Sequence, residues 1–112
     1  MAVINVKNAS KTYGSGDIKV EALKPSSFSI ERGEFVCIIG TSGSGKSTLM
    51  HLMAGVDNAT SGEIIINGKD VTKLDQEGLA LFRRREVGII YQFFNLVPVL
   101  TARENIELPL ML

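Results

Sequence analysis

The fold of this chain is decided by the stretch Gly40-Thr-Ser-Gly-Ser-Gly-Lys-Ser47, which matches the phosphate-binding pattern G-x-x-x-x-G-K-[ST]. Glycines let the backbone approach anionic oxygens closely, and successive N–H groups of such a loop point inward. A helix that begins near Lys46 adds unpaired N–H groups and the positive end of its dipole. The residues that we expect to cradle phosphates are Gly40, Thr41, Ser42, Gly43, Ser44, Gly45, Lys46, Ser47 and Thr48.

Two side chains of the motif have distinct chemical tasks. Lys46 is expected to reach the β- and γ-phosphates, and the Ser47 hydroxyl is expected to hold Mg²⁺. The stretch is not the dinucleotide pattern G-x-G-x-x-G, because Thr48 stands where that pattern needs its last glycine. The alternative interpretation is a flexible glycine-serine turn, and the flanking sequence distinguishes between the two.

The flanks predict an α/β core around the loop. Phe35-Val-Cys-Ile-Ile39 is continuously apolar, which predicts a parallel strand buried on both faces and a buried Cys37. Residues 47–54 have apolar side chains at helical spacing, and Gly55 is a plausible stop. A second apolar strand is predicted over residues 87–91. Because a strand before the loop and a helix after it are both predicted, the phosphate-binding interpretation is favoured over the flexible turn.

Other segments give local signals. Residues 1–34 predict a small antiparallel sheet with a turn over 12–17 and with Pro25 at an edge or a break. Asn67-Gly68 predicts a hairpin turn after a strand over 63–67. A short helix is predicted over 75–85, and Thr101-Ala-Arg-Glu104 has capping-box spacing for a last helix.

Composition limits the class of protein. The chain has 112 residues with 12 basic and 12 acidic side chains, so it lacks the basic excess of a nucleic-acid binder and we expect no such partner. One cysteine excludes an internal disulfide framework. The start lacks a signal-peptide pattern and no apolar run has the length of a membrane span, so we expect a soluble domain in a reducing compartment.

Taken together, these stretches resemble the amino-terminal half of an ABC transporter ATP-binding subunit. Beyond the loop, the resemblance rests on Lys11-Thr-Tyr-Gly14, Thr60-Ser-Gly-Glu-Ile-Ile-Ile-Asn-Gly68 and Val87-Gly-Ile-Ile-Tyr-Gln92. Leu81-Phe-Arg-Arg-Arg-Glu-Val-Gly88 and Phe94-Asn-Leu-Val-Pro-Val-Leu-Thr101 are similar to the lipoprotein-releasing and macrolide-exporting branch.

The resemblance implies roles and a layout. Tyr13 would stack on adenine, and Gln92 would meet Mg²⁺ or position the attacking water; from the residues alone, an ordinary turn tyrosine and a polar strand end remain open. The fold implied is a partial P-loop NTPase core with an antiparallel β subdomain at the amino terminus. Its parts would be the β segment 1–34, the core 35–92 from phosphate loop to Q-loop, and the start of the helical subdomain, 93–112.

The family's remaining catalytic motifs are not found in these 112 residues. No apolar strand ends in Asp-Glu, and no Leu-Ser-Gly-Gly-Gln-like signature occurs. We therefore expect a fragment or truncated product that is not hydrolytically competent alone, an expectation that the apolar run 108–112 also favours. A small-molecule kinase is a third interpretation, against which Gln92 and the long β segment before the loop count.

The function implied is the ATP-binding portion of an ABC transporter ATPase. It would power export, or transport of lipoprotein, peptide or macrolide type, with ATP and Mg²⁺ as cofactors. Its partners would be a membrane permease and a second ATP-binding subunit, with which it would form a homodimer. Phe93 to Leu100 would lie near the coupling helices of the permease. It would be cytoplasmic and peripheral to the membrane. The alternative is a truncated nucleotide-binding module without hydrolysis. The sequence does not identify the transported substrate.

Overall fold

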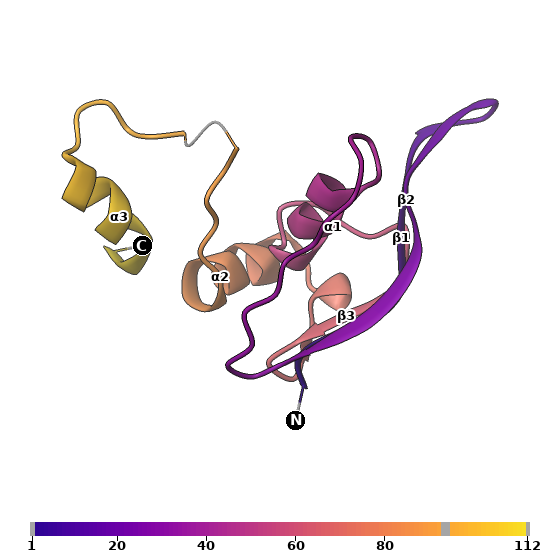
Figure 1. Cartoon of the computed structure of the whole chain (residues 1–112), viewed down its shortest axis with the longest axis horizontal. Helices are drawn as coiled ribbons and strands as arrows, with labels where there is room; N and C mark the ends of the chain where they lie inside the picture. Colours follow the sequence, from indigo (N-terminus) through magenta and orange to yellow (C-terminus); the bar gives the residue numbers. More distant parts are fainter. Residues whose placement is uncertain (1, 93–94, 112) are drawn as a thin grey trace.

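The structure is a four-stranded antiparallel sheet with the first two α-helices on one face, while the last helix lies apart from the sheet (Figure 1). It is a computed structural model and describes residues 2–92 and 95–111. The sheet has the strand order β2-β1-β3-β4. Its elements are, in chain order, β1 (Ala2–Ser15), β2 (Ile18–Glu31), α1 (Lys46–Met53), β3 (Ser61–Ile66), β4 (Lys69–Asp70), the 3-10 helix η1 (Val71–Lys73), α2 (Gln76–Glu86) and α3 (Ala102–Met111).

The antiparallel sheet predicted for the amino terminus is confirmed, but the turn predicted over 12–17 is wrong: β1 continues to Ser15, and only residues 16 and 17 form the turn. β1 and β2 form one continuous hairpin, paired from Ala2↔Glu31 to Ser15↔Ile18. Pro25 lies in the edge strand β2, where the register shifts between Ala9↔Ser26 and Lys11↔Leu23. An edge position beside a bulge accommodates a residue without an N–H donor, so the hairpin continues past the proline.

The other local signals are confirmed within a residue or two. Asn67 and Gly68 form the turn between β3 and β4, both with positive φ (50° and 82°). α1 begins at Lys46, and Gly55 follows its end. The capping box is present: Thr101 N donates to Glu104 Oε1 at 2.9 Å, and Glu104 N donates to Thr101 Oγ1 at 3.1 Å. Reciprocal bonds of this kind satisfy two backbone donors at a helix start.

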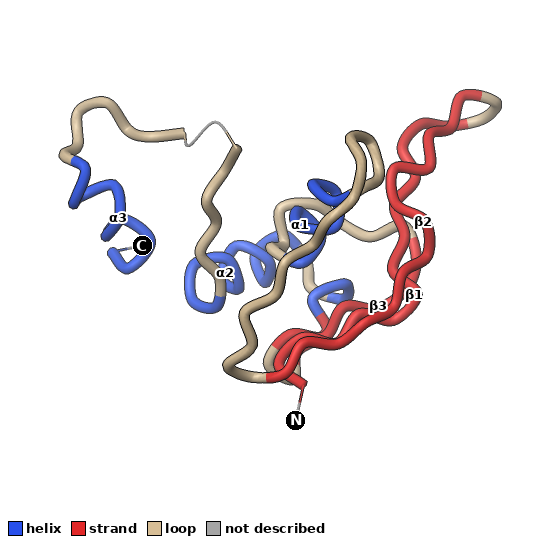
Figure 2. The backbone as a smooth tube through the Cα atoms, viewed as in Figure 1, coloured by secondary structure: helices blue, strands red, loops and turns tan. Residues whose placement is uncertain are grey.

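The prediction of buried strands over residues 35–39 and 87–91 is wrong. Residues 35–39 and 87–91 have no regular secondary structure, and the described part of the chain contains antiparallel pairing alone (Figure 2). Phe35, Ile39 and Ile90 are almost fully exposed (101%, 86% and 90%), and Cys37 is exposed, not buried. A parallel strand needs neighbouring strands for its backbone groups and helices on both faces. Within the described residues neither stretch has such neighbours.

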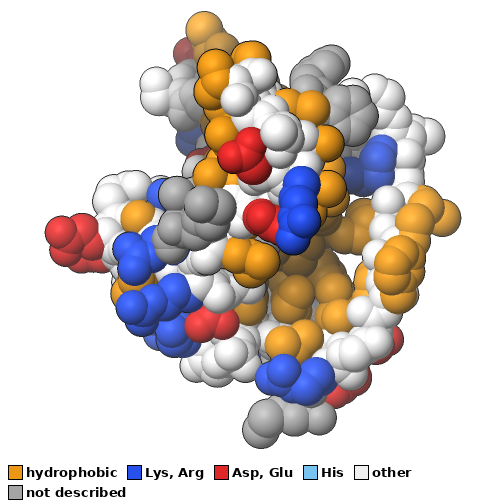
Figure 3. All heavy atoms as spheres, turned by 90° about the vertical axis from the view of Figure 1, so that its left-hand side faces the viewer, with side chains coloured by type: hydrophobic (Ala, Val, Ile, Leu, Met, Phe, Trp, Pro, Cys, Tyr) orange, Lys and Arg blue, Asp and Glu red, His pale blue; other side chains and the backbone are white. Residues whose placement is uncertain are grey.

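The exposed apolar side chains are visible on the molecular surface. Figure 3 shows hydrophobic side chains on the face that it presents, including around a hollow. A groove of about 450 Å³ lies between β2, the 34–38 segment and α1, lined by Phe28, Ile30, Val36, Ile38 and Leu49 among others. Phe93 and Phe94 lie outside the described residues. Phe94 begins the stretch that resembles the export branch, and both belong to the segment expected near the permease.

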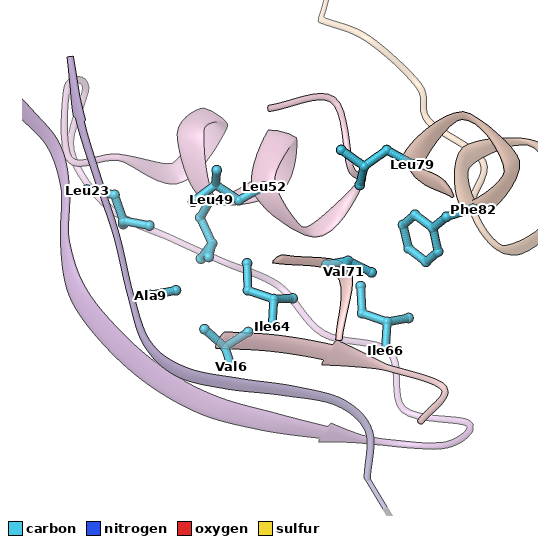
Figure 4. Close-up of a cluster of buried hydrophobic side chains, with 10 residues drawn as sticks. All are labelled: Val6, Ala9, Leu23, Leu49, Leu52, Ile64, Ile66, Val71, Leu79 and Phe82. Carbon is cyan, nitrogen blue, oxygen red and sulfur yellow. The ribbon is translucent and has the colours of Figure 1, made fainter. Parts of the chain in front are cut away.

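The core lies between the sheet and helices α1 and α2 (Figure 4). Val6, Leu52 and Ile64 are its most deeply buried large side chains, at 1–2% exposure. Full burial of such a side chain contributes about 1.5–3 kcal/mol. Arg83 on α2 donates through Nη1 to the Gly55 carbonyl at 2.6 Å, which ties α2 to the end of α1. The core thereby holds α1, and with it the loop before α1, against β1, β2 and β3. Its members are Val6, Ala9, Leu23, Leu49, Leu52, Ile64, Ile66, Val71, Leu79 and Phe82.

Candidate functional site

The predicted phosphate loop is an irregular segment that leads directly into α1 (Figure 2). Ser44 N donates to the Thr41 carbonyl at 3.2 Å, which closes the loop on itself. Gly43 and Gly45 have φ of 79° and 99°, values that a residue with a Cβ rarely adopts. Gly45, which the motif requires, and Gly43, which it does not, are therefore both needed for the backbone path that this loop takes.

Gly45 also sets the distance between the loop and the sheet. A Cβ at this position would lie 2.7 Å from the Ala22 carbonyl oxygen and 3.2 Å from Leu23 Cδ1, both on β2. The end of the loop thus rests directly on the β1–β2 hairpin. Because Leu23 pairs with Lys11 across the hairpin, this contact places the loop beside the β1 segment that contains Tyr13.

The amino-terminal end of α1 has no side-chain acceptor of its own. Its N-cap residue is Gly45, without a side-chain cap hydrogen bond, and its first turn contains no acidic residue. A helix start leaves backbone N–H groups unpaired and carries a partial positive charge. The end of α1 is therefore suited to an external anion, as the motif predicts.

Lys46 directs its ammonium group into the loop. Nζ donates to the Gly40 carbonyl at 2.6 Å, the Thr41 carbonyl at 2.8 Å and Ser44 Oγ at 3.3 Å. These three neutral acceptors surround the one cation of the loop. An entering polyphosphate offers the same donors anionic oxygens, with which hydrogen bonds are stronger. The loop and the lysine thus form one unit that can accept several phosphate oxygens.

The remaining loop residues have simpler surroundings. Ser47 is exposed on the first turn of α1, beside Lys46, so its hydroxyl is accessible to a cation bound next to a phosphate. Thr48 is half-buried on the same turn. A hydroxyl oxygen is a donor of the kind that Mg²⁺ takes, together with water and phosphate oxygens. Ser47 therefore fits a magnesium site of which the phosphates supply further ligands.

Tyr13 is part of a cluster that sequence reasoning missed. Its hydroxyl donates to the Asp57 carboxylate, and Lys11 Nζ lies 3.2 Å from Asp57 Oδ1 and 5.0 Å from the centroid of the Tyr13 ring. Asp57 lies in the loop after α1, 44 residues from Tyr13, and no local pattern marks it. The pKa of the Tyr13 phenol is raised, first by this hydrogen bond, then by burial and by the charge of Asp57.

Gln92 is not brought to the loop by any recorded contact. It is exposed in a turn after the irregular segment 87–91, and the hydrogen bonds and ion pairs of the described residues include none between Gln92 and residues 40–48. Within residues 2–92 and 95–111, no group of three His, Cys, Asp or Glu side chains is arranged to hold a metal ion. None of the helices described has the length and apolar character needed to cross a membrane.

Comparison with known proteins gives one consistent family. A family model described as ABC transporter matches residues 23–110. The chain is 48% identical over 109 residues to the macrolide export ATP-binding/permease protein MacB of Bdellovibrio bacteriovorus, a match that covers 97% of this chain and 17% of that protein. It is 52% identical over 114 residues to the uncharacterized ABC transporter ATP-binding protein YvcR of Bacillus subtilis, covering 100% of this chain and 44% of that protein.

A solved structure gives the same answer for the fold. The ATP-binding cassette MJ0796, in a dimeric post-hydrolysis state bound to ADP and Pi, is 44% identical to this chain with a TM-score of 0.88. The match covers 96% of this chain and 47% of that one. The chain thus spans less than half the length of each of these three proteins. The likeness to a complete cassette agrees with the partial P-loop NTPase fold expected from the sequence.

Proposed function

The chain belongs to the ABC transporter family, whose model matches residues 23–110, and from this premise we propose that residues 40–48 bind the phosphates of Mg-ATP. The observation that carries the proposal is the position of Lys46. Its ammonium group lies inside the loop with three acceptors within 3.3 Å, at the uncapped start of α1. A single cation, a glycine-rich loop and a helix end thus converge on one place, an arrangement suited to a polyphosphate.

Each residue of the proposed site has one task. The backbone N–H groups of residues 40–45 and the first turn of α1 hold phosphate oxygens, and Lys46 neutralises the terminal phosphates. Ser47 and Gln92 would supply oxygen ligands to Mg²⁺, which would neutralise part of the phosphate charge. Tyr13 stacks on the adenine ring. The contact of Gly45 with Ala22 and Leu23 on β2, the strand that pairs with β1, supports this assignment of Tyr13.

The first test compares nucleotides that differ in phosphate number. Calorimetric titration of the chain with Mg-ATP is expected to give an affinity at least about tenfold higher than titration with AMP, because AMP lacks the phosphates that Lys46 contacts. The two ligands share the adenosine, so the difference isolates the phosphate loop. Equal affinities for ATP and AMP would contradict a phosphate-binding role for residues 40–48.

Transport work is proposed for the larger assembly. We propose that the cassette acts as a dimer with a second ATP-binding subunit and drives a membrane permease of the export type from the cytoplasmic face. Two similar proteins support this proposal. The relative from Bdellovibrio bacteriovorus is a macrolide export ATP-binding/permease protein, and the solved cassette MJ0796 is dimeric. In this proposal, the permease selects the transported substrate.

Hydrolysis is expected to need more than these residues. We propose that the 112-residue chain binds Mg-ATP without turning it over, because neither the acidic motif nor the signature motif of the family is found in its sequence. Phosphate release is expected to equal that of the Lys46→Ala variant, which serves as the background. A turnover that Lys46→Ala abolishes would overturn this part of the proposal.

A further inference from the structure

The Tyr13 ring is held in place by two charged neighbours. The Tyr13 hydroxyl donates to Asp57, and Lys11 bridges the two by lying 3.2 Å from Asp57 Oδ1 and 5.0 Å from the ring centroid. Lys11 Nζ also donates to the Asn58 carbonyl at 2.6 Å. Tyr13 is 44% exposed, so part of the residue is accessible to a ligand. The ring of Tyr13, in strand β1, thus has its hydroxyl bound to Asp57 and an ammonium group over it, which is more than an ordinary exposed tyrosine has.

The backbone on both sides of this cluster is also fixed. Thr12 N donates to Thr60 Oγ1 at 2.8 Å, and Thr60 N donates to the Ser10 carbonyl at 2.8 Å. These bonds tie β1 to the 57–60 segment on either side of Lys11. The cluster therefore joins two stretches that are far apart in the sequence, and a rotation of the ring would have to break the hydrogen bond to Asp57.

Helix α1 relates this cluster to the phosphate loop. Lys46 begins α1, and the N–H groups of Val56 and Asp57 donate to the His51 carbonyl in its last part, at 3.0 and 3.3 Å. The position of Asp57 is thus set by the same helix that positions Lys46. A base held by Tyr13 and a phosphate held by Lys46 would be spaced by one rigid element.

We propose that Asp57 and Lys11 are positioning residues that hold the Tyr13 ring ready to stack on the base of the nucleotide whose phosphates occupy residues 40–48. This inference rests on the proposed function. A ring that is oriented before the ligand arrives loses less conformational freedom on binding, which raises affinity without any new contact. Lys11 balances the carboxylate, so that Asp57 adds little net negative charge next to a polyphosphate.

The ionisation of the pair agrees with this role at neutral pH. The pKa of Asp57 is lowered, first by the hydrogen bond from Tyr13 and further by the Asn58 N–H and Lys11, while burial opposes the shift. Because the carboxyl pKa is lowered in the folded state, Asp57 contributes stability above about pH 4, and this contribution is lost as the pH falls. Because the phenol pKa is raised, Tyr13 contributes stability below about pH 10, and this contribution is lost as the pH rises. The contact between Tyr13 and Asp57 is therefore complete at neutral pH.

The test separates base from phosphate by using two ligands, Mg-ATP and Mg-tripolyphosphate, on the full chain. Asp57→Ala is expected to weaken Mg-ATP binding about three- to tenfold, a part of what base–aromatic stacking contributes, and to leave tripolyphosphate binding unchanged. Asp57→Asn keeps an oxygen acceptor for the Tyr13 hydroxyl, so it is expected to retain most of the affinity for Mg-ATP that Asp57→Ala loses. Asp17→Ala removes an exposed carboxylate from the β1–β2 turn and serves as the matched control.

A double-mutant cycle identifies the route of the effect. Tyr13→Phe keeps the ring and removes the hydroxyl, so it is expected to match Asp57→Ala, and the double variant is expected to lose no more than either single variant. Additive losses would overturn the role of the hydroxyl contact. An equal loss of both ligands in Asp57→Ala would show a structural role and overturn the proposal, as would no loss of either.

The outcomes also distinguish this inference from the proposed function. If the unmodified chain binds neither ligand, the phosphate site itself fails and the positioning role falls with it. If it binds tripolyphosphate as tightly as Mg-ATP, the phosphate site stands and the base subsite is overturned.

An optical signal tests the contact without any nucleotide. The chain has two tyrosines and no tryptophan, so Tyr91→Phe leaves Tyr13 as the only phenol that ionises. In that background, ultraviolet titration is expected to give Tyr13 a pKa above the ordinary value of about 10, and Asp57→Ala, which removes the acceptor, is expected to lower it toward that value. An identical phenol pKa in both proteins would show that Asp57 does not hold the hydroxyl and would overturn the proposal.

Discussion

Replacement of Lys46 by alanine is expected to weaken Mg-ATP binding by about ten- to a hundredfold, the equivalent of one hydrogen bond to a charged group. Lys46 is the cation that the loop surrounds, and its ammonium group contacts Gly40, Thr41 and Ser44 at once. When it is removed, the phosphates keep the backbone donors and the end of α1 but lose the one full positive charge. Calorimetry with Mg-ATP measures the change directly.

The matched control for this variant is Lys73→Ala. Lys73 lies on the 3-10 helix η1 with its side chain 74% exposed, and its removal changes the net charge by the same amount. Its affinity for Mg-ATP is expected to stay within about twofold of the unmodified chain, because exposed charges at a distance are screened. If Lys46→Ala and Lys73→Ala bind Mg-ATP equally well, the loop is not the phosphate site.

Replacement of Gly62 by alanine is expected to be among the most destabilising single changes in the sheet, at about 3–5 kcal/mol from backbone strain and overpacking together. Gly62 has a φ of 88° on β3, where a left-handed backbone is unfavourable for any residue with a Cβ. Its Cβ would lie 2.2 Å from the Asn8 carbonyl oxygen and 2.6 Å from Ala9 Cα. Both are main-chain atoms of β1, so relief requires movement of the strand, not of a side chain.

This prediction concerns the place where β1 bulges against β3. The register between these strands shifts between Lys7 and Ser10, and Asn8 itself has a φ of 49°. Val6 and Ala9, on either side of the bulge, are in the core. A displaced bulge would therefore disturb core packing as well as the ladder. A native stability of about 5–15 kcal/mol leaves little reserve for such a loss.

The control for Gly62→Ala is Gly33→Ala. Gly33 has nearly the same φ, 86°, and a Cβ there would meet no atom within 4 Å. Its substitution carries the backbone cost alone, about 1–2 kcal/mol. Urea unfolding followed by circular dichroism gives both free energies of unfolding. Equal losses in the two variants would show that the contact with β1 has no energetic consequence.

Much of the local structure could be predicted because its causes lie within a few residues. The glycines and Lys46 of the loop, the Asn67-Gly68 turn and the capping box at Thr101 each depend on neighbours in the chain, and each is present as expected. The boundaries of α1 and α2 follow from apolar spacing and differ from the prediction by about one residue. The roles of these residues toward a nucleotide remain proposals.

The errors concern structure that depends on distant partners. The apolar segment 35–39 has the composition of a buried strand, but a strand exists only where another strand accepts its hydrogen bonds, and the described residues pair antiparallel elsewhere. The hairpin β1–β2 is longer than its weak alternation suggested, because each strand supports the other across register shifts that no local pattern marks.

The glycine conformations of the 40–47 loop, the Asn67-Gly68 turn and the capped start of the last helix could be predicted from the sequence, because each depends on residues a few positions apart. The tertiary structure alone decided that the end of the loop rests on β2 at Ala22, and that Tyr13 meets Asp57 and Lys11. Gly45 and Ala22 are 23 positions apart in the chain, and Asp57 is 44 positions from Tyr13 and 46 from Lys11. They meet because burial of the apolar faces of β1, β3 and α1 in one core brings the hairpin, the loop and the end of the helix together.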